Sequence, residues 1–346
     1  MKIEIIKDSI RFKKIRSQWE ELYSLGSYSI FQSFTYNYYA WQHIISNSKG
    51  SDLYIIIIYD GSEIIAIFPC YKDNFNIVRF INDHHSDFCD ILSKDYFDIN
   101  TLFKKLDCKR FSLIHLKKGS ILYNLVSKID KSIYRIKEGV RFSSIEIPEG
   151  SFPDNFIRYR SKQKSEIRRI KKKNRNFQHR SYSVKDMSFP KDKIIDLKDR
   201  IISSRLRTED FLDNDLINLI EDMYNNSDLI ISEVFELDSR SNINSLSISF
   251  ILVRENDYQF WIDLFIDKTM INLYNYIKFI EFVSLDKNVS INFGRGDYRY
   301  KISNFQSDIA QLYSFNTYST SIDLLFRYYI LDRIRDIVRK IYYKIK

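Results

Sequence analysis

The segment INFGRGDYRYK, residues 291 to 301, contains residue types that could catalyse the transfer of an acyl group to an amine. Gly294 and Gly296 are the only glycines after residue 150, and glycine permits positive φ and close backbone approach at low steric cost. We therefore expect a strand that ends at Phe293, followed by a turn. The turn would present one group of side chains: Arg295, Asp297, Tyr298, Tyr300 and Lys301.

Acyl transfer from a thioester requires a group that takes the amine proton and a group that protonates the leaving thiolate. Asp297 is the candidate base, and Tyr300 or Tyr298 the candidate acid. Lys301 completes the catalytic set, and Arg295 and Tyr298 would contact the substrate. The alternative is structural: Arg295 and Asp297 pair to brace the turn, and Tyr300 packs.

A second polar cluster lies in the loop NDHHSDFCD, residues 82 to 90. His84, His85 and Asp87 would contact substrate if this loop lines a cleft between the two halves of the chain. The alternative is that these side chains form hydrogen bonds that cap the loop. No Cys or His lies at a spacing that closes a tetrahedral zinc site, so we expect no metal.

A basic block covers residues 158 to 175, RYRSKQKSEIRRIKKKNR, with ten Lys or Arg against Glu166 alone. Its net charge of +9 equals that of the whole chain, so the remainder is neutral. A local block is a weaker sign of polynucleotide binding than a basic face over a whole domain. We expect a phosphate-bearing ligand, such as a nucleotide, a nucleotide sugar or a lipid headgroup, or a solvated helix face.

The chain has 346 residues, of which 44% are hydrophobic, and this favours about two globular domains. Cys70, Cys89 and Cys108 show no metal-ligand spacing and are expected as buried, reduced thiols. The N-terminus has no apolar signal-peptide region, and no stretch approaches the roughly 18 apolar residues of a membrane span. These features favour a cytoplasmic location.

Hydrophobic periodicity predicts helices and strands in both halves of the chain. Asp60-Gly61 between two β-branched runs predicts a hairpin. Pro148, Gly150 and Pro153 mark a boundary. The main predicted helices cover residues 10–25, 35–45, 156–174 and 271–285, and the predicted strands include residues 2–6, 133–137, 142–147, 230–237, 245–254, 259–266, 290–293 and 311–318.

The order of these elements predicts an α+β fold in which helices flank a bent, mostly antiparallel sheet in each half. The predicted domains are residues 1–150 and 151–318. Residues 319–346 carry apolar side chains at helical spacing and a net charge of +4, which predicts a basic amphipathic C-terminal helix. Such a helix could lie on the inner face of an anionic membrane or dock on protein.

The segment FGRGDYRYKISNF resembles the motif that ends the domain in GNAT-type N-acyltransferases of the FemAB-like, double-GNAT group associated with polysaccharide biosynthesis. The basic helix with Arg168 and Arg169 is similar to the helix that opens the second half in this group. The first half and the loop INDHHSDFCDIL also resemble the group. The residues of the first half that match are Trp19, Phe31, Gln32, Ser33 and Trp41.

This resemblance implies two tandem GNAT-like domains and an acyl-CoA-dependent N-acyltransferase. The implied acceptor is the amino group of an amino sugar in a nucleotide- or lipid-linked glycan precursor, and the implied cosubstrate is acetyl-CoA or another acyl-CoA. Gln32 and Trp41 would contact the acceptor. Arg168 and Arg169 would contact the cosubstrate.

The segment DKTMINLYNY, residues 267 to 276, departs from the family pattern. GNAT enzymes usually hold the coenzyme A pyrophosphate on backbone N–H groups of a glycine-rich turn at a helix N-terminus. This segment has no glycine, so side chains would hold the pyrophosphate, with Thr269 and Asn272 as candidates. Two alternatives stay open: a FemAB-type transferase that uses aminoacyl-tRNA, and a catalytically inactive GNAT scaffold that binds a glycan precursor or a partner.

Overall fold

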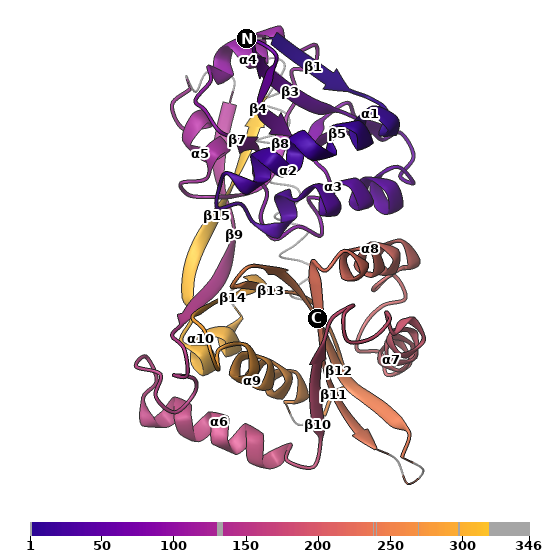
Figure 1. The fold of residues 1–346 in the computed structure, drawn as a ribbon, viewed down its shortest axis with the longest axis vertical. Helices are drawn as coiled ribbons and strands as arrows, with labels where there is room; N and C mark the ends of the chain where they lie inside the picture. Colours follow the sequence, from indigo (N-terminus) through magenta and orange to yellow (C-terminus); the bar gives the residue numbers. More distant parts are fainter. Residues whose placement is uncertain are drawn as a thin grey trace, which may run out of the picture. The chain divides into compact units, whose positions relative to one another are not determined.

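The computed structural model describes residues 2–129, 134–237, 239, 241–268, 270–296 and 298–317. The chain divides into two compact units (Figure 1). Unit 1 comprises residues 1–28, 45–139 and the chain from Gln311 onward, and unit 2 comprises residues 29–44 and 140–310. The units differ from the predicted domains because residues 29–44 and 140–150 belong to the second unit and Gln311 to Thr317 to the first. The predicted C-terminal helix lies outside the described residues.

Unit 1 contains a four-stranded antiparallel sheet in the order β1-β3-β4-β7. The predicted hairpin at Asp60-Gly61 is confirmed: it joins β3 to β4, and Gly61 has a φ of 57°. The strands are β1 (Lys2–Ile6), β3 (Ile55–Asp60), β4 (Glu63–Phe68) and β7 (Leu92–Ser93). Helix α2 packs on β4 and β7.

The rest of unit 1 surrounds a core of buried aliphatic and aromatic side chains, among them Phe68, Phe80 and Phe111. A small sheet has the order β2-β5-β6, and β8 pairs with β15. The remaining elements are β2 (Asp52–Leu53), β5 (Cys70–Lys72), β6 (Val78–Phe80), β8 (Ser112–Lys117), β15 (Asp308–Thr317), α1 (Ser9–Lys14), α2 (Arg16–Ser24), α4 (Ile99–Lys105) and α5 (Ile121–Val126).

Unit 2 contains a twisted sheet in the order β10-β11-β12-β13-β14-β9. The pair β13 and β14 is parallel, and the other neighbours are antiparallel. A parallel pair needs a crossover connection, and α9 supplies it. The strands are β9 (Tyr134–Ile147), β10 (Gln178–Tyr182), β11 (Leu229–Leu237), β12 (Ile243–Arg254), β13 (Asp257–Phe265) and β14 (Val289–Arg295).

Helices cover both faces of the unit 2 sheet, with α9 on one face and α7 and α8 on the other (Figure 1). Helix α6 packs against α9 and α10. The helices are η1 (Ile30–Gln32), α3 (Phe34–Ala40), η2 (Trp41–Ile45), α6 (Ser161–Lys173), α7 (Lys191–Ser203), α8 (Asn214–Asn225), α9 (Ile271–Val283) and α10 (Arg299–Phe305). The predicted α+β class, with mostly antiparallel sheets, is confirmed.

Three element boundaries differ from the sequence-based expectation. The helix predicted over 10–25 is two helices, α1 and α2, and the strands predicted at 133–137 and 142–147 are one strand, β9. The basic helix starts at Ser161, not at Phe156. Phe156 and Tyr159 are buried and pack edge to face with ring centroids 4.9 Å apart, so the residues before α6 form an aromatic anchor. No helix within the described residues is long and apolar enough to cross a membrane.

Candidate active site

The parallel strands β13 and β14 separate part of the way along their length. Their pairing covers Asp257 to Gln259 opposite Ser290 to Asn292, whereas β13 continues to Phe265 and β14 to Arg295. The register of β13 on β12 also shifts at Trp261, which is the signature of a β-bulge. The bulge sets which face of the sheet each following side chain of β13 occupies.

Asp263 lies on β13 just after the bulge and faces α9. Its Oδ1 accepts a hydrogen bond from Ser249 Oγ at 2.7 Å, and its Oδ2 accepts a short one from the Tyr276 hydroxyl. Burial raises the pKa of Asp263 above its usual value, although the hydrogen bonds from Tyr276 and Ser249 offset part of this effect. A carboxyl group with a raised pKa binds a proton more strongly, which suits a general base.

Asp263 also lines a small pocket, together with residues of α7 and of the connection between α7 and α8. Its walls are mostly apolar, and Arg207 is the cation among them. The connection between α7 and α8 supplies Leu206, Arg207 and Phe211, and the guanidinium of Arg207 lies 5.2 Å from the centre of the Phe211 ring. The pocket is lined by Ile201, Leu206, Arg207, Phe211, Asp263 and Phe265.

Tyr300 and Lys301, two of the predicted catalytic residues, begin α10 next to this carboxylate. The Tyr300 ring lies 6.5 Å from the Tyr276 ring, and burial, with a further contribution from the negative charge of Asp263, raises the pKa of the Tyr300 phenol. The hydroxyl of Tyr300 is therefore protonated at neutral pH. The structure brings Tyr300 together with two residues that the motif did not indicate, Asp263 and Tyr276.

Lys301 is 3% exposed, and its ammonium is surrounded by backbone carbonyls at the end of β14. Its Nζ donates to the oxygen of Phe293 at 2.5 Å and of Arg295 at 3.0 Å, and the carbonyls of Gly294 and Gly296 lie at 3.4 Å. These contacts brace the glycine turn. The structural alternative for this segment named Arg295 and Asp297 as the bracing pair, whereas here the bracing contacts come from Lys301.

The strand does not end at Phe293 as expected, because β14 continues to Arg295: Gly294 lies where the register of β14 on β9 shifts, and Gly296 lies in the bend that follows the strand. Gly294 has a φ of 71° and Gly296 a φ of 92°, a region that disfavours other residues. A Cβ atom on Gly296 would lie 2.6 Å from the Tyr298 ring. Tyr298 is 61% exposed and stacks on Tyr300 with ring centroids 6.0 Å apart. Arg295 pairs with Phe142 of β9, and Asp297 lies outside the described residues.

Helix α9 begins beside the basic helix α6. Met270, its N-cap residue, has a left-handed backbone with a φ of 61°, and Arg169 donates to Met270 Sδ at 3.4 Å. Arg169 also pairs with Glu166. Lys162 and Lys173 lie on the same side of α6 as Arg169, at spacings of seven and four residues. Arg169 therefore lies at the α9 N-terminus, with Lys162 and Lys173 on the same side of α6.

The other residues predicted to bind the cosubstrate were not found at the α9 N-terminus. Arg168 pairs with Asp154 at 2.9 Å, away from Met270. The side chain of Asn272 turns toward the sheet, where it accepts from Ser247 Oγ at 3.4 Å and contributes a hydrogen bond to Asp263. Thr269 lies outside the described residues.

Gln32 and Trp41, predicted to contact substrate, are both buried in unit 2. Gln32 completes a capping box, because its Oε1 accepts from Ser29 Oγ at 2.7 Å and from the Ser29 backbone N–H at 3.1 Å. Trp41 is the first residue of η2. Nearby, Phe31 packs against Trp261, the bulge residue of β13.

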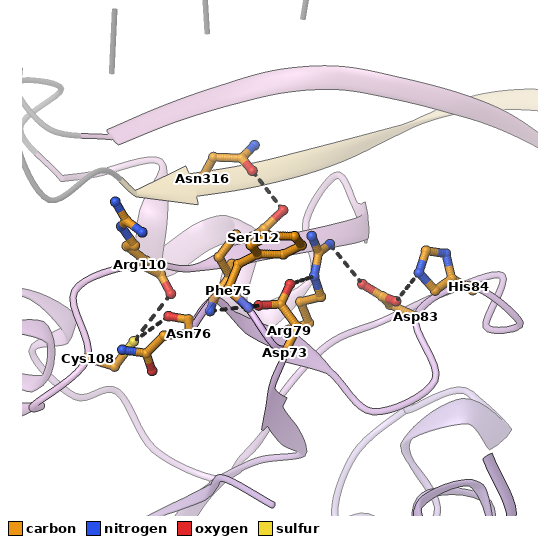
Figure 2. A network of polar contacts seen from close by, with 11 residues as sticks. Asp73, Phe75, Asn76, Arg79, Asp83, His84, Cys108, Arg110, Ser112 and Asn316 are labelled. Carbon is orange, nitrogen blue, oxygen red and sulfur yellow. Dashed lines mark hydrogen bonds and ion pairs between the residues drawn. The ribbon is translucent and has the colours of Figure 1, made fainter. Parts of the chain in front are cut away.

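The loop with His84, His85 and Asp87 belongs to unit 1, and its innermost charge is Asp83. Figure 2 shows Arg79 between Asp73 and Asp83, with the His84 ring on the far side of Asp83. Asp83 lies 3.9 Å from the Arg79 guanidinium and 3.7 Å from His84 Nε2. The described residues contain no group of three or more His, Cys, Asp or Glu side chains that could hold a metal ion.

Sequence reasoning missed Asp263, Tyr276 and Arg207. One signal was present: Asp263 is the only charged residue in the run YQFWIDLFI, and a charge in a buried strand needs a partner. A second signal was the alternation of Ser245, Ser247 and Ser249 along an apolar strand, which indicates a polar face.

No protein-family model and no curated relative matches the sequence. Solved structures do resemble the fold. FemX aligns with a TM-score of 0.53 at 10% identity over 90% of this chain and 97% of its own. L-PGS from Bacillus licheniformis gives 0.54 at 8% identity over 87% and 91%. A conserved protein of unknown function from Bacteroides thetaiotaomicron gives 0.51 at 9% identity over 91% and 100%. At these identities the likeness shows the fold alone.

Proposed function

We propose that this chain is an acyl-CoA-dependent N-acyltransferase that acts on the amino group of an amino sugar in a nucleotide- or lipid-linked glycan precursor. The observation that carries the proposal is the Asp263 carboxylate, held by two neutral hydroxyls at a pocket beside the separated ends of β13 and β14. The FemX-like fold and the Arg-Gly-Asp…Tyr-Lys motif support it.

In this proposal the neutral acceptor amine attacks the acyl carbon, and Asp263 takes a proton from the nitrogen as the carbon–nitrogen bond forms. The carbon–sulfur bond then breaks, and the thiolate takes a proton from the Tyr300 hydroxyl. The proton on Asp263 returns to the tyrosinate through solvent, which restores both groups. Arg207 is the pocket cation available for a phosphate or carboxylate of the acceptor.

The N-terminus of α9 is the proposed phosphate site for the cosubstrate. Backbone N–H groups in the first turn of a helix favour anions. Arg169 lies against Met270 at this terminus, and Lys162 and Lys173 share its side of α6. These cations take the place of the glycine turn that the sequence lacks.

The test is calorimetric titration with acetyl-CoA, followed by a transfer assay on amino-sugar acceptors. We expect micromolar binding to the wild type and a loss of about tenfold or more in Arg169→Ala, since one charge-assisted contact contributes about 1.5 to 3 kcal/mol. Arg168→Ala, which removes the neighbouring arginine from its pair with Asp154, is the matched control and should bind nearly as the wild type. Equal losses in both variants would count against this site.

A FemAB-type transferase that takes an aminoacyl group from tRNA is the second candidate. The cations of α6 and the absence of the glycine turn favour it. RNA binding should then fall with a log-log salt slope of about −0.7 per contacted phosphate. Binding of tRNA without acetyl-CoA binding would select this candidate. Binding of a glycan precursor with neither donor would select the inactive scaffold.

A further inference from the structure

Several cations on α6 and in the loop before it are not part of the proposed cosubstrate site. Arg160, Lys172 and Arg175 are exposed, and none of them has an ion-pair partner among the residues that the structure describes. Lys172 shares one side of the helix with Arg168, at i and i+4, and Arg175 follows in the turn just after the helix ends at Lys173. Around the helix, Lys172 lies about a sixth of a turn from Arg169, and Arg168 lies about a quarter of a turn from it.

Exposed apolar side chains lie next to these cations. Ile157, in the loop before α6, is 93% exposed although its neighbours Phe156 and Tyr159 are buried. Phe282 and Leu285, at the end of α9, are 59% and 72% exposed.

The loop and the end of α9 are joined by backbone contacts. Gly150 N donates to Ser284 O at 2.8 Å, and Glu149 N donates to Asn288 Oδ1 at 2.9 Å. On the same flank, Lys171 of α6 pairs with Glu281 of α9 at 2.6 Å. The exposed isoleucine, the end of α9 and the cations therefore belong to one region of unit 2, which we call the α6 surface: residues 149–175 and 281–288.

We propose that the α6 surface binds an anionic phospholipid bilayer. Arg160, Lys172 and Arg175 would meet the headgroups, while Ile157 and the exposed end of α9 would enter the boundary between headgroups and acyl chains. Basic residues near an anionic surface and apolar side chains beside them are the combination that holds a protein at a membrane interface.

RNA is the other polyanion that these cations could bind, but the apolar side chains beside them favour a lipid bilayer. Proteins bind single-stranded RNA by stacking bases on exposed aromatic rings. The aromatic residues that precede α6 are Phe152, Phe156 and Tyr159, and each is at most 9% exposed. Phe282, at the end of α9, is the exposed ring of this surface, and the aliphatic side chains of Ile157 and Leu285 are more exposed than it is. Most of the exposed apolar side chains are therefore aliphatic, which suits acyl chains. This inference does not depend on the proposed transferase activity.

Vesicle co-sedimentation of the full chain tests the proposal. The probes are vesicles of phosphatidylcholine alone and vesicles in which about one lipid in three is phosphatidylglycerol. We expect binding to the second kind only, with an affinity that falls as salt rises. The double variant Lys172→Glu/Arg175→Glu should weaken binding by about tenfold or more, because each basic residue near an anionic surface contributes about fivefold in affinity.

Two further variants sharpen the result. Ile157→Asp should weaken vesicle binding without changing acetyl-CoA binding. The matched control, Lys185→Glu/Lys198→Glu, makes the same charge change elsewhere in unit 2 and should bind vesicles nearly as the wild type. The proposal is overturned if the wild type ignores anionic vesicles or if the α6 double variant binds them unchanged. It is also overturned if RNA, but not vesicles, binds in a manner that requires Lys172 and Arg175.

Discussion

Asp83 in unit 1 and Asp263 in unit 2 are both carboxylates inside the protein, and their surroundings differ. Asp83 lies between the cationic side chain of Arg79 and the ring of His84. Asp263 is held by the neutral hydroxyls of Ser249 and Tyr276, and the charge of Lys301 offsets only part of the effect of burial on its pKa. A cation stabilises the charged form of a carboxylate, whereas burial among neutral groups raises its pKa. The difference separates a carboxylate that holds a loop together from one that can exchange a proton with a substrate.

The largest effect expected from this comparison is on catalysis. Asp263→Asn should reduce transfer by about 100-fold or more, the range of a general acid-base contribution. The free energy of unfolding should not fall at neutral pH. The folded-state pKa of Asp263 is raised, so its stabilising contribution is present at low pH and is lost as pH rises through that pKa.

Steady-state assays and urea unfolding of Asp263→Asn measure these two outcomes. Asp257→Asn, an exposed residue on the same strand, is the control and should change neither. Asp297→Asn compares the base that the motif suggested with the base that the structure suggests. If Asp297→Asn abolishes transfer and Asp263→Asn leaves it intact, Asp297 is the base and the assignment of Asp263 is wrong.

The second expected effect is on stability, in unit 1. Arg79→Met leaves Asp83 and Asp73 without their shared guanidinium, and removal of one partner of a buried pair costs about 3 kcal/mol or more. Transfer measured below the unfolding transition should stay close to the wild-type rate. Chemical denaturation of the variant gives the free energy of unfolding.

Arg16→Met breaks an exposed ion pair with Glu20 in the same unit and measures how much stability a surface ion pair contributes. It should cost less than about 1 kcal/mol. An Arg79→Met protein that is as stable as Arg16→Met would show that the charges around Asp83 do not hold the loop. Asp83 would then no longer be an example of a carboxylate that holds a loop together.

The sequence predicted much of the fold because its signals are local. The hairpin at Asp60-Gly61 and the basic helix follow from turn chemistry and periodicity within a few residues. The positive φ of Gly294 and Gly296 was also predictable, although β14 continues to Arg295 and does not end at Phe293. These features depend on neighbours in the chain.

The candidate base was not predictable in the same way. The face that Asp263 occupies depends on the bulge at Trp261, and a shift of one residue in register moves every later side chain to the other face. The loop at 82–87 shows the same limit: the sequence pointed to His84, His85 and Asp87, whereas Asp83 is its most deeply buried charged residue. Burial and hydrogen-bond partners come from contacts between distant segments, which local patterns do not specify.

The smallest expected effect concerns His179, which belongs to the same network of neutral groups as Asp263. His179 Nε2 lies 2.9 Å from Ser232 Oγ, Ser232 donates to Asn275, and Asn275 donates to Ser249, which holds Asp263. Burial, with the charge of Lys278 nearby, lowers the pKa of His179 to about 4. Surroundings that favour the neutral form thus raise the pKa of the acid and lower that of the histidine.

The folded-state pKa of His179 lies below the unfolded value, so its contribution to stability is present at neutral pH and is lost as pH falls from about 6.5 toward 4. The loss should reach roughly 2 kcal/mol, and His179→Gln should remove this part of the pH dependence. Urea unfolding of both proteins between these pH values measures the difference. Parallel pH curves for wild type and His179→Gln would show that His179 is protonated in the folded state, and that the network around Asn275 does not exclude charge.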